Sequence, residues 1–377
     1  MIITVLAFLV TLGVLVSFHE LGHYLAARSC GVRVLQFSIG FGKPLFKWID
    51  RNKTEWMVAA IPLGGFVKLV NGRDPNQHIS KEDRPHSFDV KPLWQRSWIV
   101  AAGPLANFLL AILLLSLIYI SGVPQLPARL QAPIESSLAA KLGVMAGDTV
   151  NEWKAEGDDT FEEVISWNAL RWLLLDALTA EKGFSLQLTS VSGGNYVIDF
   201  PAERLPKMDP DTDPMKQLGI FPELKTSNTQ NGSGVNVIES FELQLDPVSA
   251  FFYATERVWL ITKVSARMML GLITGKTSFK QLSGPISIAD MAGKTAQFGW
   301  QPFISFLALL SISVGLLNLL PLPMLDGGQL MYDAWEMVSG KRIPQTLEEL
   351  FQKFGFVLII ALTMLALFND LQRYLLS

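Results

Sequence analysis

His19-Glu20-Leu21-Gly22-His23 is the stretch that decides how this chain is interpreted, because it lies in an N-terminal segment that is otherwise apolar. Polar side chains at that depth of a hydrophobic helix are costly and usually functional. Two histidines four positions apart share one helix face and suit a zinc ion, and Glu20 can act as the base that activates a metal-bound water. The pattern is typical of zinc peptidases; the alternative is a structural pair of half-buried histidines.

The composition is that of a membrane protein. Half of the 377 residues are hydrophobic, 17% are charged and the mean hydropathy is +0.32, with the apolar residues gathered in blocks. The first block, Met1 to Phe18, lacks the basic start and the cleavage site of a signal peptide, so we expect a retained anchor. The single cysteine, Cys30, excludes an intrachain disulfide, and a net charge of −3 gives no reason to expect nucleic acid as a partner.

Three further apolar blocks predict transmembrane helices. Trp98 to Ile120 has no charged residue and is long enough to cross a bilayer at about 1.5 Å rise per residue. Pro302 to Leu325 is also free of charge, but its two last prolines and the Asp-Gly-Gly that follows predict a break in the helix. Phe354 to Phe368 is short and needs flanking residues to complete a span. We therefore predict a mainly α membrane protein of four spans, with a membrane-associated β-hairpin and an inserted α+β domain.

The distribution of basic residues predicts the orientation. Residues 24 to 97 hold twelve Lys or Arg against six Asp or Glu, and the connection from 337 to 353 adds three more basic residues. By the positive-inside rule both loops are cytoplasmic. Residues 121 to 300 and both termini are then expected on the outer side, periplasmic in a bacterium, with the HExxH motif towards the cytoplasmic face.

The outer region contains a pattern similar to a PDZ domain. Residues 133 to 153 hold a small-residue helix start, a glycine turn and an alternating strand. A helical stretch around Phe161 to Leu178 and strands at Phe184 to Val191 and Tyr196 to Phe200 complete such a module, the alternative being another small α+β domain. Because a PDZ domain captures an extended peptide as an added strand, we expect it to bind substrate or a regulatory peptide.

Two segments after this module differ in character. Thr226 to Gly234 has no apolar residue and the composition of a flexible linker. Pro247 to Lys276 is apolar, yet Arg257, Lys263 and Arg267 recur near helical spacing and give it a basic face. We expect an amphipathic helix that contacts membrane lipid at the surface, rather than a fifth span.

A β-hairpin is predicted between the first two spans. Lys43 to Ile49 and Thr54 to Ile61 are predicted as two strands joined by residues 50 to 53. The free edge of such a hairpin could hold an extended substrate, the alternative being a plain cytoplasmic hairpin.

The two histidines need a third metal ligand, because a catalytic zinc usually has three protein ligands and one open position. Asp326 is the best candidate, since irregular backbone at membrane depth survives only when buried in protein or lining a wet cavity. Three other acidic residues lie in segments of ordinary helix or loop character: Asp290, Asp333 and Glu336.

Three motifs in chain order resemble those of a known family: the HExxH motif, Gly103-Pro104-Leu105-Ala106-Asn107, and Leu325-Asp326-Gly327. They are similar to the motifs of the site-2 protease family of intramembrane metalloproteases, and the resemblance covers nearly the whole chain. The inserted PDZ-like region, Leu282 to Ile288 and Asn318 to Gly328 are most similar to its bacterial regulator of sigma-E group.

This resemblance implies the chemistry of the site. It implies Zn²⁺ held by His19, His23 and Asp326, with Glu20 as general base and then acid, for hydrolysis of a peptide bond within a transmembrane helix. It also implies that the hairpin is a membrane-re-entrant β-loop.

Two amides match polar positions near the family's active site. Asn107 and Asn318 are therefore expected to contact the substrate backbone or the oxyanion, the alternative being helix-packing amides. The implied substrates are single-span membrane proteins already trimmed by another protease, such as an anti-sigma factor, with signal-peptide remnants as a second class. The implied location is the bacterial inner membrane.

One departure from the family and one competing function stay open. The regulator of sigma-E group carries two PDZ domains in tandem, whereas this chain shows one; a natural reduction and an engineered deletion joined at residues 231 to 234 both fit.

The competing function is a non-catalytic membrane scaffold that uses the PDZ-like domain to bind partners. The intact Glu20 argues against it.

The predicted organisation is a first transmembrane helix with HExxH at 1–28, a re-entrant β-loop at 34–70, a second transmembrane helix at 98–120, a PDZ-like domain at 126–222, a linker at 223–246, an amphipathic surface helix at 247–276, a third transmembrane segment with Leu-Asp-Gly at 302–336 and a fourth transmembrane helix at 351–373.

Overall fold

The computed structural model describes residues 2–74, 77–207, 213–224, 226–228, 236–275 and 283–376. Two compact units make up the chain, Met1–Leu115 with Leu282–Ser377, and Ser116–Gln281. The first unit contains most of the long apolar helices and the hairpin. The second contains the inserted α+β domain.

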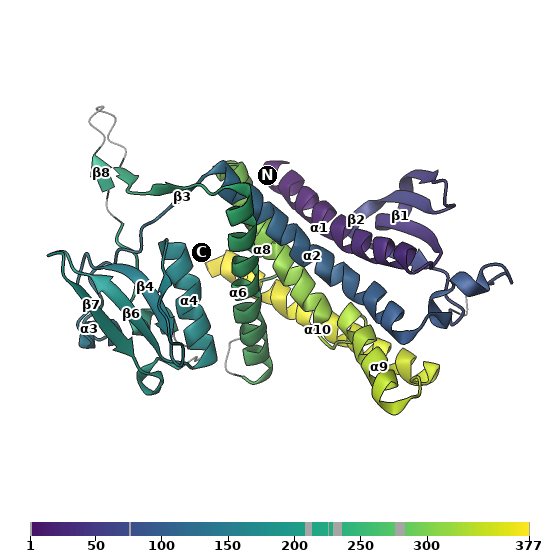
Figure 1. Cartoon of the computed structure of the whole chain (residues 1–377). Coiled ribbons are helices and arrows are strands. Elements are labelled where there is room, and N and C mark those ends of the chain that lie inside the picture. The colour runs from purple at the N-terminus through teal and green to yellow at the C-terminus, as the bar shows by residue number, and fades with distance from the viewer. Residues whose placement is uncertain are drawn as a thin grey trace. The chain divides into compact units, whose positions relative to one another are not determined.

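Four helices are long and apolar enough to cross a membrane, as predicted: α1 (Ile2–Ser29), α2 (Leu93–Ser121), α8 (Trp300–Leu319) and α10 (Gln345–Leu376). Figure 1 shows the helices α1, α2 and α8. Buried leucines of these three helices meet in one cluster, Leu15, Leu110 and Leu307. The helix α7 (Pro285–Phe298), which the sequence analysis did not predict, packs between α1 and α8. The Asp370 carboxylate of α10 accepts three backbone amides at the start of α7, from Gly284, Ile286 and Ser287, each at 3.0 Å.

The helices α1 and α2 approach each other at small residues. A Cβ on Gly22 would lie 2.2 Å from the carbonyl oxygen of Ala102, so the approach requires glycine at this position. After α1, Gly31 adopts φ +67° and the Val32 amide donates to the Ala27 carbonyl at 2.9 Å, which ends the helix. The contact at Gly22 lies inside the HExxH motif and fixes its depth against α2.

The predicted hairpin is present, within a larger sheet. The strands β1 (Val34–Ile49) and β2 (Glu55–Leu69) are antiparallel and bend at glycines with positive φ, Gly40, Gly42 and Gly64. Because of these bends, Ser38 pairs with both Met57 and Phe66. The sheet therefore has four short rows in the order 65–69, 34–39, 55–58 and 44–49, and the first and last rows are its edges.

The helix predicted from Pro302 breaks where expected. After α8, residues 320 to 325 form a tight turn that leads into α9 (Asp326–Ser339). A Cβ on Gly327 would lie 2.1 Å from the carbonyl oxygen of Leu320, and Met324 adopts φ +93°, which is unusual for a residue with a side chain. The predicted third segment at 302–336 is thus two helices, and Asp326 is the first residue of the second.

The second unit contains a four-stranded sheet in the order β5-β4-β6-β7, covered by the amphipathic helix α4. Its strands are β4 (Thr149–Ala155), β5 (Glu162–Glu163), β6 (Phe184–Thr189) and β7 (Asn195–Phe200), and its helices are α3 (Leu138–Lys141), α4 (Trp167–Ala180) and α5 (Pro214–Leu218). A short 3-10 turn occurs in this unit at Ala202–Arg204, and two others, Arg84–His86 and Phe88–Val90, belong to the first unit. Leu170, Leu174 and Leu178 share one face of α4 and are fully buried on the sheet.

The segment predicted as a linker, 223–246, contains short paired strands. The segment contains β8 (Thr226–Asn228), which pairs with β9 (Asn236–Ile238), and β10 (Phe241–Leu243), which pairs with β3 (Val123–Gln125). Composition favoured a linker because these strands are only three residues long and are stabilised by pairing. The suspected junction at residues 231 to 234 lies outside the described residues.

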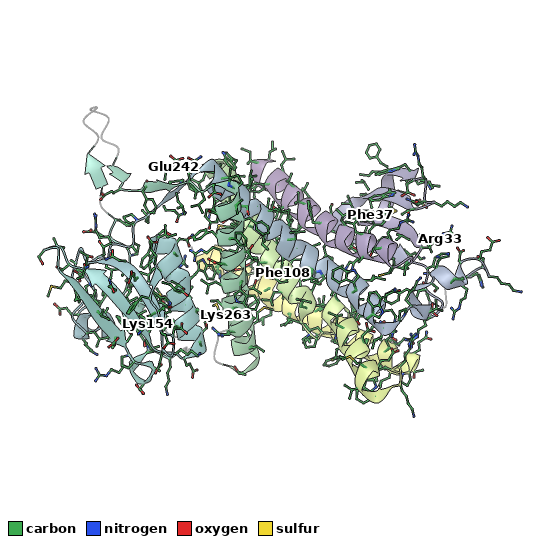
Figure 2. All side chains as sticks on the ribbon, in the orientation of Figure 1. Arg33, Phe37, Phe108, Lys154, Glu242 and Lys263 are labelled. Carbon is green, nitrogen blue, oxygen red and sulfur yellow. The ribbon has the colours of Figure 1, made fainter. Side chains whose placement is uncertain are left out.

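The basic face of α6 (Pro247–Ile273) does not have the role predicted for it. Lys263, labelled in Figure 2, and Arg267 both pair with Asp176 of α4, at 2.8 and 2.5 Å. Arg257 is buried against the Tyr253 ring. These charges bind protein groups, so they are not free to attract lipid headgroups, and the side chains that α6 leaves exposed include Phe252 and Trp259.

Candidate active site

Three side chains from two distant segments converge. His19 and His23 lie on α1. Asp326 is the first residue of α9, a position where the helix dipole favours a carboxylate. Oδ2 of Asp326 lies 3.1 Å from Nε2 of His19 and 3.4 Å from Nε2 of His23, and the two Nε2 atoms are 3.2 Å apart. Among the described residues this is the group of His, Cys, Asp and Glu side chains with the geometry of a metal site.

The donor set fits a zinc ion. Bond lengths of about 2.0 to 2.1 Å in a tetrahedral site separate neighbouring ligand atoms by about 3.3 Å. The three distances in this cluster, 3.1, 3.2 and 3.4 Å, agree with that value. Two imidazoles and one carboxylate are also the type of ligand set that leaves a fourth position open for water in catalytic zinc sites.

The ring of His23 is held in the tautomer that a metal requires. Its Nδ1 lies 2.8 Å from the carbonyl oxygen of Ile99 on α2. A carbonyl can only accept, so Nδ1 carries the proton and Nε2 presents its lone pair to the cluster. Beneath the ring, α2 has Gly103, the first residue of the second motif.

The two asparagines singled out by the sequence lie in different environments. Asn318 lines a cavity of about 390 Å³ together with His19, Glu20 and His23. Asn107 is fully buried, and its Nδ2 lies 3.2 Å from Nδ1 of His19. The structure thus brings Asn318 to the open side of the cluster and Asn107 to its buried side.

One edge of the β-sheet forms part of the cavity wall. Gly65, Phe66, Val67 and Leu69 line it, and we call this row, residues 65–69, the site-side edge. Val67 of this edge and Glu20 of α1 line the cavity together. The predicted hairpin of residues 43 to 61 contributes the opposite edge, 44–49, so the edge beside the cluster is a different one from that predicted.

The site-side edge packs tightly on α1. A Cβ on Gly65 would lie 2.8 Å from Cγ1 of Val16 and 3.2 Å from Cγ of Glu20, so glycine lets the strand approach the motif. Phe37, labelled in Figure 2, packs edge to face on Tyr24 with ring centroids 5.9 Å apart.

The other acidic candidates do not join the cluster. Asp290 pairs with Lys294 on its own helix at 2.7 Å. Asp333 and Glu336 of α9 face the buried Arg96 of α2: Glu336 pairs with it at 2.7 Å, and Asp333 accepts from the Ser97 hydroxyl at 2.9 Å. They are partners of cations and polar groups, which ties α9 to α2.

Comparison with known proteins agrees with this geometry. The family model described as "Peptidase family M50" matches residues 7–362. The chain belongs to peptidase family M50. This M50 chain is therefore a member of the site-2 protease family, a zinc-dependent metalloendopeptidase with several membrane-spanning helices.

Individual M50 relatives are similar over their whole length. The regulator of sigma-E protease RseP of Escherichia coli (strain K12) is 32% identical over 457 residues, which cover 97% of this chain and 98% of that protein. The protease RseP of Yersinia pestis is 31% identical over 450 residues, covering 97% and 98%. A protein of Rhizobium meliloti (strain 1021) named as a zinc metalloprotease is 35% identical over 382 residues, covering 98% and 96%.

These relatives differ in length. The alignment with the Escherichia coli protein spans 457 positions against the 377 residues of this M50 chain, so that relative has a segment that is absent here. The alignment with the Rhizobium meliloti protein spans only 382 positions. M50 relatives of both lengths therefore occur, and the bacterial relatives together with the four apolar helices indicate an inner-membrane protein.

Proposed function

We propose that this chain is an intramembrane endopeptidase that cleaves the transmembrane segment of single-span membrane proteins. One observation carries the proposal: His19, His23 and Asp326 converge beside a cavity that Glu20 also lines, on a helix apolar enough to span a membrane. A soluble peptidase has no use for a reaction centre on such a helix. The sigma-E regulators among its relatives support the assignment.

Each group at the cavity has a proposed role. His19, His23 and Asp326 would hold zinc, which supplies Lewis acidity and makes water acidic enough to attack at neutral pH. Glu20 takes the proton of the attacking water and returns it to the leaving amine. Asn318 donates its amide N–H to the oxygen on which negative charge develops, for which its position on the open side of the cluster is suitable.

The substrate is proposed to bind as a strand on the site-side edge. A helical substrate hides its peptide bonds in its own hydrogen bonds, so it must be unwound before water can attack. An edge strand offers replacement hydrogen bonds to an extended peptide. Val67 of this edge and Glu20 line the same cavity, so an added strand would pass close to the proposed base.

The hairpin is proposed to enter the membrane. Its outer row carries apolar side chains that are largely exposed: Leu45 is 61%, Phe46 71% and Ile49 70% accessible. Apolar residues gathered at one end of a strand pair favour contact with lipid over contact with water. The exposed apolar row supports a position of the sheet at the depth where a transmembrane substrate would be unwound.

The remaining proposals concern the substrate and its selection. We infer that residues 126–222 form a PDZ-like domain on the periplasmic side and that the active site lies towards the cytoplasm. The proposed substrates are pre-trimmed proteins such as anti-sigma factors, with signal-peptide remnants as a second class. The Rhizobium meliloti alignment of 382 positions favours a naturally single PDZ-like domain over an engineered deletion.

The test is cleavage of a tagged single-span substrate by the purified full chain, with bound zinc quantified in each variant. Glu20→Gln should retain zinc and lose cleavage by a factor of about 10² to 10⁴. Asp326→Asn should lose zinc. Asp290→Asn, which removes an exposed carboxylate paired within its own helix, is the matched control and should retain both zinc and activity.

Other outcomes would reject the proposal. Equal cleavage by wild type and Glu20→Gln would assign the activity to another site. Full zinc in Asp326→Asn would exclude the carboxylate as a ligand.

A further inference from the structure

Asn107 is enclosed on every side that the structure describes. Its side chain has no exposed surface, and its amide lies against Nδ1 of His19 at 3.2 Å. The backbone carbonyl of Asn107 accepts a hydrogen bond from the Ser311 hydroxyl at 2.7 Å. A Cβ on Gly315 would lie 3.3 Å from the Cβ of Asn107. Asn107 is therefore held between α1 and α8, and a substrate in the cavity does not reach it.

The chemistry of His19 requires an acceptor at this position. Nε2 of His19 faces Asp326 and His23, so it is the nitrogen that would bind the metal and it must then carry no proton. A neutral imidazole in that state carries its proton on Nδ1, which becomes a donor. The partner within reach of Nδ1 is the side-chain amide of Asn107.

The amide can meet this requirement. Its Oδ1 is buried and has no hydrogen-bond partner among the described residues, while its Nδ2 faces the imidazole. The two ends exchange places by a half-turn about the last side-chain bond. After the turn, the oxygen accepts the Nδ1 proton of His19, and Nε2 is free for the metal.

We propose that Asn107 is a positioning residue that fixes the tautomer and the orientation of His19, rather than a group that contacts substrate. It does for His19 what the Ile99 carbonyl does for His23. The acceptor for His23 is a backbone group, which mutation leaves in place, whereas the acceptor for His19 is a side chain. This inference rests on the proposed zinc ligands.

The experiment measures zinc affinity by competition with a chelator, using the full chain in detergent. Asn107→Leu keeps the volume but removes the acceptor, and it should weaken zinc binding by 10- to 100-fold, the usual effect of losing such a partner of a metal ligand. Asn107→Asp keeps an acceptor of the same shape and should bind zinc within a few-fold of wild type. At saturating zinc, Asn107→Leu should show an unchanged KM.

Asn318→Leu is the matched control, since it removes an amide that lines the cavity. It should lower kcat and leave zinc affinity unchanged, the reverse of Asn107→Leu. Wild-type zinc affinity in Asn107→Leu, or loss of zinc in Asn107→Asp, would overturn the inference. Unfolding temperatures in excess chelator show whether Asn107→Leu folds; if it does not, the near-isosteric Asn107→Asp decides alone.

Failure of this inference differs from failure of the proposed function. If Asp326→Asn retains zinc, the ligand set is wrong and both fail. If Asp326→Asn loses zinc while Asn107→Leu retains it, only the role of Asn107 is wrong.

Discussion

A Cβ on Gly103 would lie 2.2 Å from Nε2 of His23 and 2.5 Å from its Cε1, so the imidazole of His23 packs directly against the backbone of α2. Only a hydrogen atom fits between them. The same helix supplies the Ile99 carbonyl that accepts from Nδ1 of the ring. One turn of α2 therefore fixes both the height and the tautomer of His23.

Gly103→Ala should displace His23 and weaken zinc binding at least tenfold, because the added methyl group would lie only 2.2 Å from Nε2 of the ring. Gly13→Ala on α1 is the control, since a Cβ there meets nothing within 4 Å. Zinc content and cleavage of a single-span substrate are measured for both variants. Full zinc in Gly103→Ala would show that the ring can move without losing the metal.

Val67→Pro should abolish strand addition at the site-side edge, because proline has no N–H to donate to a substrate. We expect cleavage of a helical transmembrane substrate to fall at least tenfold while zinc is retained. Val67→Ala removes the side chain but keeps the amide, and should stay within a few-fold of wild type. Equal loss in both variants would point to the Val67 side chain instead of the strand edge.

Asp89 should give the loop between the hairpin and α2 a defined pH dependence. Burial acts to raise the pKa of Asp89, but hydrogen bonds from the Ser87 hydroxyl and the Gly72 amide, with Arg84 at 2.9 Å, hold it below its ordinary value. A depressed pKa in the folded state stabilises the fold above the unfolded pKa of about 3.9, and this stabilisation is lost as pH falls through the folded value.

Asp89→Asn should therefore destabilise the protein by about 1.5 to 3 kcal/mol near neutral pH, the range for losing hydrogen bonds to a charged group. The difference in unfolding temperature between wild type and variant should stay constant from pH 7 to about pH 5 and shrink below about pH 4. A difference that does not change with pH would mean that the charge of Asp89 is not the cause.

Asp176→Asn should loosen α6 from α4, because it removes the carboxylate that pairs with both Lys263 and Arg267. Hydrogen exchange measured by mass spectrometry should be faster in α6 than in wild type, with protection falling roughly tenfold for a loss of about 1.4 kcal/mol. Asp158→Asn, an exposed carboxylate of the same unit, should leave α6 unchanged. Unchanged exchange in Asp176→Asn would mean that these ion pairs are not what holds α6.

The sequence predicted the parts that depend on local spacing. His19 and His23 share a helix face by the period of the helix, and Asp326 follows two prolines and precedes two glycines, so its place at a helix break could be inferred. The four spans followed from uninterrupted apolar blocks. These signals lie within a few residues of each other in the chain.

What the sequence left out depends on contacts between distant segments. The strand β10 exists because it pairs with β3, more than a hundred residues earlier, and neither has a strong strand pattern. The basic residues of α6 have the spacing of a lipid-binding face, and only the packing of Asp176 against them gives the charges protein partners. In the sequence, Asn107 and Asn318 are both polar residues in apolar helices. In the structure they differ, because Asn107 is fully buried and Asn318 lines the cavity.

The position of Asp326 has a consequence for the biosynthesis of the protein. The helix α1, with both histidines and Glu20, leaves the ribosome before α8, whereas the carboxylate that completes the cluster follows only after α8 and its terminal turn. A nascent chain thus carries the proposed base and two of the proposed ligands but no complete donor set. On the proposed function, a nascent chain that ends before α9 is therefore inert towards the other newly inserted helices beside it.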